Sequence, residues 1–234
     1  MAQLTTLDGA VVLVTGANGG LGREFVHQAL AQGAAKVYAT ARTPQSWDDP
    51  RIVPLALDIT DPASVAEAAG TAADVTVLIN NAGASNGSSV IGELAAARAL
   101  FDTNFWGQLQ VTNAFAPILG ANGGGAILNV LSVLSWLAIA DAYSATKAAL
   151  WSATNTQRLA LAGQGTQVLG LHLGYTDTPM TKNIDAPKND PADVVSAAYA
   201  GLLAGAHEVL ADEVSRQVRA GLAAPLSALY PQLA

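Results

Sequence analysis

The sequence predicts an α/β fold in which a mostly parallel β-sheet is covered by helices on both faces. Short runs of β-branched and aliphatic residues alternate along the chain with longer segments rich in alanine and leucine. The runs are continuously apolar, which is typical of strands buried on both faces. No linker divides the 234 residues, a length that fits one large domain. We therefore expect a single doubly wound domain over residues 1–234, with about seven parallel strands.

The apolar runs give the order of the expected elements. The expected strands cover residues 11–15, 36–40, 52–57, 75–80, 126–131, 167–172 and 207–211. The expected helices cover residues 20–32, a segment that begins at Asp61, and residues 92–119, 142–161 and 191–203. Asp61 and Pro62 suit a helix start, because aspartate caps the first turn and proline fits its first position. Residues 181–190 form the most polar loop, which we expect to be a short substrate loop.

Composition excludes several classes of protein. The net charge is −7, which repels nucleic acids and anionic membranes. The absence of cysteine excludes disulfides and thiolate metal sites. The cleanest apolar stretch, residues 126–140, is 15 residues long, whereas a membrane-spanning helix needs roughly 20. The N-terminus lacks the basic segment and apolar core of a signal peptide, so we expect a cytoplasmic protein.

Three histidines are the remaining candidates for metal ligands. His27 lies on an expected helix, whereas His172 and His207 lie on expected strands. None of them stands at metal-ligand spacing from another histidine or acid. We therefore expect all three to be structural, and we expect no metal site.

A glycine-rich segment joins the first expected strand to the first expected helix. It consists of Thr15, Gly16, Ala17, Asn18, Gly19, Gly20, Leu21 and Gly22. Glycines allow the backbone to approach a pyrophosphate closely, and a helix N-terminus offers free N–H groups and partial positive charge. A glycine-rich turn without a ligand is the alternative, but its position between a strand and a helix favours nucleotide binding.

The spacing of this turn is T-G-x-x-x-G-x-G, and four further motifs follow it in order. They are Asp58-Ile59, Asn80-Asn81-Ala82-Gly83, Asn104 and Tyr143-Ser144-Ala145-Thr146-Lys147. With these motifs, from Thr15 to about Met180, the chain resembles the short-chain dehydrogenase/reductase family. The resemblance implies a Rossmann-type NAD(P)-binding domain that acts as an oxidoreductase on a small ketone, aldehyde or alcohol. It also implies a homodimer or homotetramer, in which unusually apolar helices of the chain would be buried.

The resemblance assigns a set of cofactor contacts. Asp58 and Ile59 would contact adenine, and Asn81, Ala82 and Gly83 would pass close to the adenosine ribose. Thr176 and Thr178 would contact the nicotinamide carboxamide and a phosphate, although Leu173 stands where the family commonly has proline. The other expected contacts are Thr15, Gly16, Asn18, Gly19, Gly20, Leu21, Gly22, Tyr143 and Lys147. For Asp58, a turn or cap residue is the alternative.

The end of the second strand indicates which dinucleotide is bound. An acidic residue there binds the ribose 2′-hydroxyl of NAD, whereas this chain has Ala41 followed by Arg42. A guanidinium can bind a 2′-phosphate in forked geometry, so we predict NADP(H) in preference to NAD(H). Two points favour the alternative: Arg42 would suit a solvated loop, and Gly19 stands where NADP-using relatives often have a second basic residue.

Tyr143 and Lys147 are the expected proton-transfer pair. They lie four residues apart, so their side chains share one face of the expected helix. A nearby ammonium, together with an oxidised nicotinamide, would lower the pKa of the phenol from its usual value of about 10. An acid/base group works best when its pKa is near the working pH.

Two further residues complete the expected catalytic group. Ser132, at the end of the fifth strand, can hydrogen-bond the substrate oxygen, and Ser135 is the rival candidate. Asparagine is unfavourable inside a helix unless it has a task, and Asn104 lies inside one. The resemblance implies that Asn104 holds a water that links Lys147 to solvent. In the predicted reaction, Ser132 polarises a carbonyl while Tyr143 donates the proton.

Other interpretations stay open at this stage. A sugar-nucleotide epimerase is one, although such relatives tend to have a longer C-terminal region. A nucleotide sensor that binds NAD(P) without turnover and an NAD-preferring alcohol dehydrogenase are the others. Tyr175, Trp136 and Leu137 are candidates for an apolar substrate pocket, or else ordinary core residues.

Overall fold

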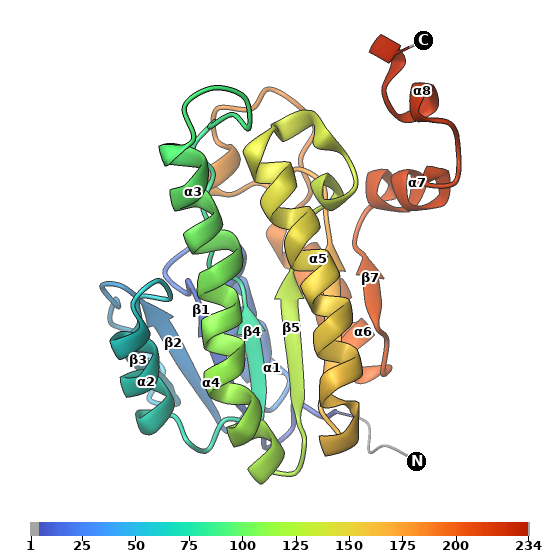
Figure 1. Cartoon of the computed structure of the whole chain (residues 1–234). Coiled ribbons are helices and arrows are strands. Elements are labelled where there is room, and N and C mark those ends of the chain that lie inside the picture. Colours follow the sequence, from blue (N-terminus) through green and yellow to red (C-terminus); the bar gives the residue numbers. More distant parts are fainter. Residues whose placement is uncertain (1–4, 234) are drawn as a thin grey trace.

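Within residues 5–233, which the computed structural model describes, seven parallel strands form one sheet in the order β3-β2-β1-β4-β5-β6-β7 (Figure 1). The strands are β1 Val11–Thr15, β2 Lys36–Ala41, β3 Ile52–Ala56, β4 Val77–Asn80, β5 Ala126–Val130, β6 Gln167–His172 and β7 Glu208–Leu210. The α-helices are α1 Gly20–Ala31, α2 Pro62–Thr71, α3 Ala95–Phe101, α4 Gln108–Ala121, α5 Ala142–Leu161, α6 Pro191–Leu203, α7 Glu213–Gly221 and α8 Leu226–Leu229. This is the predicted doubly wound, Rossmann-type α/β fold. Residues 1–4 and 234 of the expected 1–234 domain lie outside the described residues.

The strand order places two loops of the predicted site side by side. The chain first runs outward from β1 to β3 and then returns, so that β4 pairs with the other edge of β1. At such a reversal the loops after the two neighbouring strands diverge and leave a crevice at the carboxyl ends. The glycine turn after β1 and the Asn81-Ala82-Gly83 segment after β4 therefore meet at this edge.

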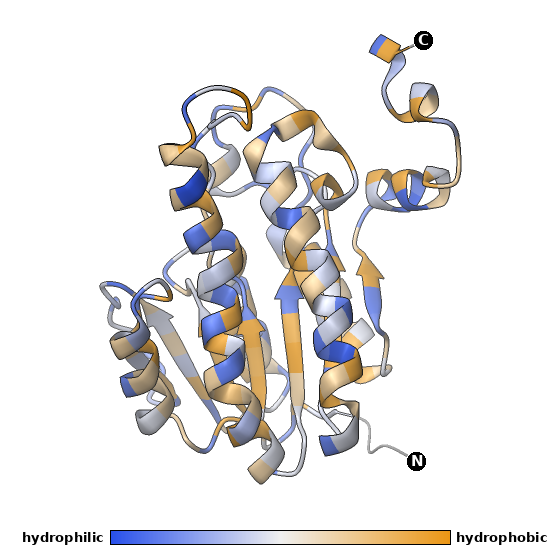
Figure 2. Ribbon diagram, in the orientation of Figure 1, coloured by the Kyte–Doolittle hydropathy of each residue, from blue (hydrophilic) through white to orange (hydrophobic). Residues whose placement is uncertain are grey.

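Each face of the sheet is covered by its own hydrophobic cluster. Side chains alternate along a strand, so Val12 and Val14 face one cluster and Leu13 faces the other. Helices α1 and α6 cover the first face, where the Tyr199 hydroxyl donates to the Phe25 carbonyl at 2.8 Å. Helices α2 and α4 and the end of α5 cover the second face. Figure 2 shows the resulting hydrophobic strands in the middle of the sheet.

Most expected boundaries agree with the structure to within a residue or two. The expectation for residues 75–80 was wrong at its start, because β4 begins at Val77. Val75 instead closes the turn after α2 through a bond from its N–H to the Ala72 carbonyl. The helix expected over residues 92–119 also differs, because it begins at Ala95 and is α-helical only in two parts.

A π-helical segment, Asp102–Gly107, joins α3 to α4. Two contacts with distant segments accompany its wider turn. A Cβ at Gly107 would lie 2.9 Å from Ile59, so only glycine allows this approach, and the Asn104 side chain turns inward to bond Ala84. Single π turns of this kind occur often at functional sites.

The C-terminal helices α7 and α8 were not expected. They follow the edge strand β7 and lie beside the main body of the molecule (Figure 1). Asp212 starts α7, because its carboxylate accepts from the Ser215 N–H at 2.7 Å. No helix in the described part of the chain has the length and hydropathy that crossing a membrane requires.

Candidate active site

The glycine turn after β1 is built by close backbone contacts. Gly16 and Gly20 have φ angles of 68° and 53°, which favour glycine. A Cβ at Gly22 would lie 2.2 Å from the Gly16 carbonyl oxygen, so no other residue fits there. The Asn81 amide donates to the Thr15 carbonyl at 2.8 Å and thereby joins this turn to the loop after β4.

The turn fits the phosphates of a dinucleotide. No side chain caps the N-terminus of α1, whose first N–H groups are therefore free for a ligand. A Cβ at Gly19 would meet no atom within 4 Å, so the space beside the turn is open. The Thr178 methyl group would lie 3.2 Å from a Cβ at Gly20, which brings the loop after β6 to the same place. Leu21 is half-buried and packs against the core.

Arg42 lies directly after β2, on a loop that is fixed to the glycine turn. The Asn18 amide donates to the Thr43 carbonyl at 2.8 Å, and the Asn18 oxygen accepts from the Gln45 N–H at 3.4 Å. Asn18 thus anchors the loop that carries Arg42. The Arg42 side chain is exposed, and its charge contributes to lowering the pKa of Asp58.

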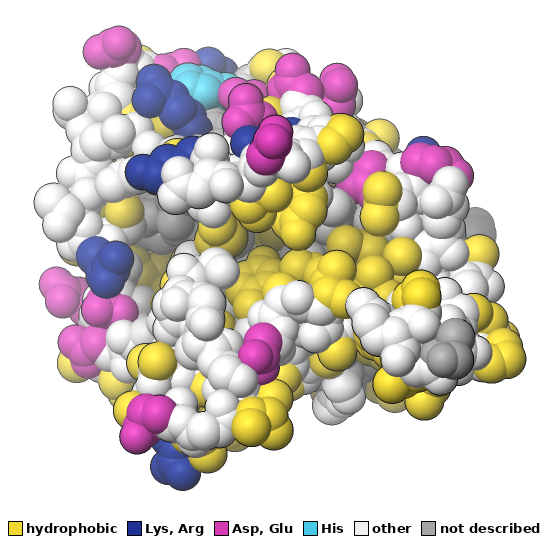
Figure 3. Space-filling view, turned by 90° about the horizontal axis from the view of Figure 1, so that it is seen from above, with side chains coloured by type: hydrophobic (Ala, Val, Ile, Leu, Met, Phe, Trp, Pro, Cys, Tyr) yellow, Lys and Arg dark blue, Asp and Glu magenta, His cyan; other side chains and the backbone are white. Residues whose placement is uncertain are grey.

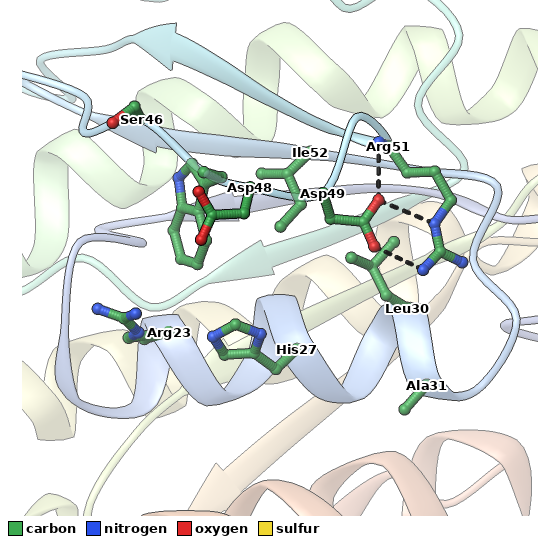
Figure 4. A pocket seen from close by; sticks show the side chains of 10 residues that line it. Arg23, His27, Leu30, Ala31, Ser46, Asp48, Asp49, Arg51 and Ile52 are labelled. Carbon is green, nitrogen blue, oxygen red and sulfur yellow. Dashed lines mark hydrogen bonds and ion pairs between the residues drawn. The ribbon is translucent and has the colours of Figure 1, made fainter.

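The same loop packs onto α1 beyond Arg42. The Trp47 ring lies 5.5 Å from the His27 ring, and the Arg23 guanidinium lies 5.5 Å from the centre of the Trp47 ring. Next to them is a hollow of about 410 Å³, into which Arg23 and His27 extend from α1 on the side opposite Asp48 (Figure 4). Its lining contains neither Arg42 nor any member of the predicted catalytic group. The hollow is therefore separate from the proton-transfer residues.

Asp58 and Ile59 follow β3. One Asp58 oxygen accepts from both the N–H and the hydroxyl of Thr60, at 2.9 and 2.7 Å. These bonds lower the pKa of Asp58, most strongly through the N–H. They are the bonds of a turn residue, the alternative that the sequence left open. Ile59 is buried against Gly107, within the cluster on the α4 side of the sheet.

Tyr143 and Lys147 share one face of α5, as their spacing predicted. Lys147 is buried, and its ammonium donates to the Val130 carbonyl, at the end of β5, at 2.8 Å. The Lys147 nitrogen lies 5.8 Å from the centre of the Tyr143 ring. Tyr143 is half-buried and packs, as Ala84 does, against the small cluster of Ala97, Leu100 and Ala142. The pair therefore lies beneath the loop after β4 and beside the end of β5.

Burial sets the charge state of both groups. It raises the pKa of Tyr143 to about 12, and it lowers the pKa of Lys147 to about 8. The expected lowering of the Tyr143 pKa is therefore not found in this structure. At 5.8 Å from the ring centre, the ammonium does not outweigh the loss of water around the phenol. Near pH 7 the phenol is protonated, as a proton donor must be.

Ser132 lies just after β5 and is buried. Its hydroxyl accepts from the Leu134 N–H at 3.1 Å and lies 3.5 Å from the Leu173 carbonyl oxygen. These contacts aim the hydroxyl at the loop after β6. The rival Ser135 is also buried, and its hydroxyl has no hydrogen-bond partner among the described residues. Both serines therefore lie on the segment that joins β5 to α5, the helix that carries Tyr143.

Asn104 is fully buried on the π-helical segment. Its oxygen accepts from the Ala84 N–H at 2.8 Å, and its amide donates to the Ala84 carbonyl at 2.9 Å and to the Thr146 hydroxyl at 3.1 Å. A Cβ at Gly83 would lie 3.3 Å from the Asn104 oxygen and 4.0 Å from the Lys147 nitrogen. Asn104 therefore joins the loop after β4 to α5 next to Lys147.

The loop after β6 is more ordered than its sequence suggested. Thr176 is buried and forms an isolated parallel β-bridge with Asn189. Its carbonyl accepts from the Thr181 hydroxyl. Thr178 precedes a short 3-10 turn, Pro179–Thr181, and forms a capping box with Thr181, in which the side chain of each residue contacts the backbone of the other. Tyr175 is 40% exposed, whereas Trp136 is buried and stacked on His172 at 3.9 Å. Of these two aromatic candidates, only Tyr175 presents surface to a substrate.

Sequence reasoning missed two groups near the site. The ring of His172 lies behind Ser132, with Nδ1 3.1 Å from the Ser132 carbonyl oxygen and Nε2 3.7 Å from Glu208, whose pKa it lowers to about 2. Asp141, two residues before Tyr143, has φ 54° and ψ −123°, a turn conformation that favours glycine. A charged residue at a turn directly before the catalytic motif was the available signal.

Metal binding has no support in the geometry of the described chain. Across residues 5–233, no three histidine, aspartate or glutamate side chains are grouped so that they could hold a metal ion. His207 lies in the turn before β7, and its carbonyl accepts from the Arg158 guanidinium at 2.7 Å.

Comparison with known proteins places these features in a family. Residues 10–189 match the family described as short chain dehydrogenase. A short-chain dehydrogenase from Burkholderia cenocepacia J2315, solved in complex with NADP, is 39% identical, with a TM-score of 0.91 over 98% of this chain and 99% of that chain. The short-chain dehydrogenase/reductase GME11361 of Pestalotiopsis microspora is 34% identical over 74% of this chain and 61% of that protein. The match thus spans less than two thirds of the Pestalotiopsis relative. The ketoacyl reductase HetN of Nostoc is 29% identical over 90% of this chain and 81% of that protein.

Proposed function

The chain belongs to the short-chain dehydrogenase/reductase family, and we propose that it is an NADP(H)-dependent oxidoreductase that interconverts a carbonyl and a secondary alcohol. The carrying observation is the buried Lys147 ammonium, fixed 2.8 Å from the Val130 carbonyl below the Tyr143 ring. This arrangement puts a proton donor and a cation together at the carboxyl edge of the sheet. The family is one of pyridine-nucleotide oxidoreductases, and the substrate and the role of Tyr143 are our proposal.

Each residue of the site has a distinct task in this scheme. The free N–H groups of α1 and the open side of Gly19 hold the pyrophosphate. The dinucleotide, when bound, supplies or accepts the hydrogen and the electron pair. Ser132 donates its hydroxyl hydrogen to the substrate oxygen and orients it. Tyr143 donates the proton during reduction and accepts it during oxidation.

Lys147 and Asn104 support the proton transfer. The Lys147 ammonium stabilises negative charge on the phenol oxygen after the proton has left. Asn104 holds the loop after β4 against α5 through its two bonds to Ala84. Because the Asn104 amide is already engaged with Ala84 and Thr146, we assign it a positioning role. A water that links Lys147 to solvent would be held by neighbouring backbone.

The test of the catalytic role is the substitution Tyr143→Phe, with Tyr199→Phe as the matched control. We expect Tyr143→Phe to reduce the rate of NADPH oxidation with a ketone by a factor of about 100 or more, without weakening NADPH binding. Tyr199→Phe removes the same hydroxyl group from a tyrosine in the core between α1 and α6 and should retain the rate. If Tyr143→Phe leaves the rate unchanged, the proposed mechanism is wrong.

The proposed preference for NADP(H) rests on two residues at the end of β2. Ala41 stands where NAD-binding proteins have an acidic residue, and Arg42 follows it. The Burkholderia relative was solved with NADP, which supports the same preference here. Replacing Arg42 with Asp should weaken NADPH binding at least about tenfold, so that NADH binds as tightly as NADPH or more tightly. Tighter binding of NADH by the unmodified protein, unaffected by this substitution, would refute the role of Arg42.

Assembly and location follow as further parts of the proposal. Trp106 is 54% exposed, and Phe105 packs against it at 4.7 Å on the outer surface of the α3–α4 region. An apolar surface of this kind is stabilised when another subunit covers it. We infer a homodimer or homotetramer in the cytoplasm, which light scattering of the purified protein and fractionation of its source cells would test.

A further inference from the structure

Exposed apolar side chains gather at one end of the molecule. Among the described residues, eleven large hydrophobic side chains are exposed, and nine of them lie on segments that follow β4, β5, β6 or β7. These nine are Val90, Ile91, Leu94, Ile139, Tyr175, Met180, Val214, Leu226 and Leu233. The other two, Trp106 and Leu159, lie on helices that cover the sheet. Since parallel strands all end at the same edge, the six residues on the segments after β4, β5 and β6 lie on the side of the sheet where Tyr143 lies. The other three, Val214, Leu226 and Leu233, belong to the C-terminal helices and turn.

Hydrogen bonds join these segments around the predicted site. The Asp141 carboxylate accepts from the Val90 N–H at 2.7 Å, which holds the loop after β4 to the start of α5. The Tyr230 hydroxyl accepts from the Ala138 N–H at 3.0 Å, which holds the C-terminal segment to the loop after β5. Ala84, from the loop after β4, packs against the same small apolar cluster as Tyr143. The apolar side chains are therefore arranged around the entrance to the catalytic residues.

Charged groups in these segments are few and are already engaged. Residues 84–94 contain one charged side chain, Glu93, which accepts from the Ala95 N–H at 3.0 Å. Residues 131–142 contain only Asp141, which is bonded to Val90. Arg219, on α7, lies 3.5 Å from Glu208 and 5.6 Å from the centre of the Trp136 ring. The segments after β4 and β5 thus present no cation to an anionic substrate.

Two cations, Lys182 and Lys188, lie on the loop after β6, and Lys182 is exposed. Lys188 lines a polar hollow of about 650 Å³ together with Glu24, Asp177 and Asp190, on the α1 side. Figure 3, which looks onto the carboxyl ends of the strands, shows hydrophobic side chains across the hollowed middle of this face. Most of the charged side chains in that view lie toward its margins. The segments after β4 and β5 therefore give the entrance to Tyr143 an apolar surface without cationic groups.

We propose that the substrate is an uncharged ketone or secondary alcohol with an extended apolar body. The reacting oxygen would lie at Tyr143 and Ser132, and the apolar body would lie against side chains such as Ile91, Ile139 and Met180. This inference rests on the proposed function, because it names the substrate class of that same site. A carboxylate or phosphate on the apolar body would make a carbonyl compound a poor substrate, since the charge would lose water against the segments after β4 and β5 without gaining a partner there.

The test uses a series of methyl ketones of increasing chain length with NADPH. Burial of one methylene group predicts that kcat/KM increases about fourfold per added carbon until the chain outgrows the entrance. Ketones of the same length with a terminal carboxylate should react at least about tenfold more slowly. A kcat/KM that does not change with length, or one that favours the carboxylates, would overturn the inference.

A matched pair of variants locates the effect. Ile139 and Leu159 are both exposed, at 64% and 81%, but only Ile139 lies at the entrance. Ile139→Asp should lower the preference for a long ketone over a short one about tenfold, whereas Leu159→Asp should retain it. Equal effects of the two substitutions would show that Ile139 has no role in recognition.

Binding of unreactive ligands separates this inference from the proposed function. Tertiary alcohols lack the carbinol hydrogen and cannot be oxidised, so calorimetry can measure their affinity without turnover. If affinity increases with chain length in the unmodified protein, but less in Ile139→Asp, the apolar entrance is supported. If no ketone is reduced in that case, only the proposed function fails. If short or charged ketones are reduced while these alcohols do not bind, the proposed function stands and the inference fails.

Discussion

Replacement of Lys147 by methionine should stabilise the protein near neutral pH while it abolishes activity. The ammonium is 3% exposed and has one protein partner, the Val130 carbonyl at 2.8 Å. Methionine has similar length and no charge, so it can fill the same space. The substitution therefore exchanges a buried cation for an apolar side chain, at the cost of one hydrogen bond.

The expected size follows from the pKa of Lys147. Burial lowers it from 10.5 to about 8, which corresponds to about 3 kcal/mol of unfavourable free energy for the charged form in the folded state. The lost hydrogen bond from a charged donor offsets about 1.5–3 kcal/mol of this gain. We therefore expect the free energy of unfolding of Lys147→Met near pH 7 to be higher by up to about 1.5 kcal/mol.

The pH dependence provides the sharper measurement. Because the folded pKa is lower than the unfolded one, the unfavourable term is fully present below about pH 8. Between about pH 8 and pH 10.5 the unfolded chain binds the additional proton, so stability of the unmodified protein increases with pH through this contribution. The variant lacks the group, so its stability relative to the unmodified protein should fall by about 3 kcal/mol across that range.

Urea unfolding of both proteins at several pH values, followed by circular dichroism, measures this difference. Lys36→Met serves as the control, because Lys36 is partly exposed and binds Asp74, which raises its pKa. The difference between Lys36→Met and the unmodified protein should show no change of this sign between pH 8 and pH 10.5. If Lys147→Met is less stable near pH 7 and its deficit does not vary with pH, then Lys147 is not a destabilised cation and the reasoning is refuted.

Three further substitutions test separate parts of the structure. Gly22→Ala places a Cβ 2.2 Å from the Gly16 carbonyl, so it should lower the free energy of unfolding by about 1–3 kcal/mol and weaken NADPH binding, which a fluorescence titration measures. Asp141→Gly relieves the strained φ of 54° but removes the hydrogen bond to the Val90 N–H. The free energy of unfolding should therefore change by less than about 1 kcal/mol, while the KM for ketone increases. Asp141→Asn should retain both values. Tyr199→Phe removes a buried hydrogen bond on the face of the sheet covered by α6, so urea unfolding should show a loss of about 1 kcal/mol with unchanged activity.

The fold could be predicted because its determinants are local. Strands β1 and β6 are buried on both faces, so their sequences are continuously apolar and differ from those of the helices. Helix α6 begins at Asp190-Pro191, where the Asp190 carboxylate accepts from the Ala192 N–H at 2.8 Å. Such a start can be predicted from the sequence alone. The alternation of these elements predicts a parallel sheet covered by helices, whereas the strand order was given by the structure.

The features that could not be predicted depend on contacts between distant segments. The π-helical turn at Asn104 exists because Gly107 meets Ile59 and because the asparagine bonds Ala84, and neither contact leaves a local signal. The raised pKa of Tyr143 likewise depends on how deeply neighbouring segments bury the phenol. The spacing of Tyr143 and Lys147 predicted that their side chains share a face of the helix. It did not predict whether burial or attraction to the ammonium has the larger effect on the pKa of Tyr143.

In the proposed mechanism, the pKa values of Tyr143 and Lys147 have complementary roles. The phenol of Tyr143, with a pKa of about 12, keeps its proton at neutral pH, which suits the donor in carbonyl reduction. Lys147, with a pKa of about 8, is still mostly charged there and lies close enough to stabilise the phenolate when it forms. The protein therefore holds an unfavourable buried charge before reaction, and that charge becomes favourable only when the proton leaves Tyr143. This is preorganisation: the free energy spent in burying Lys147 is recovered in the state that follows proton transfer.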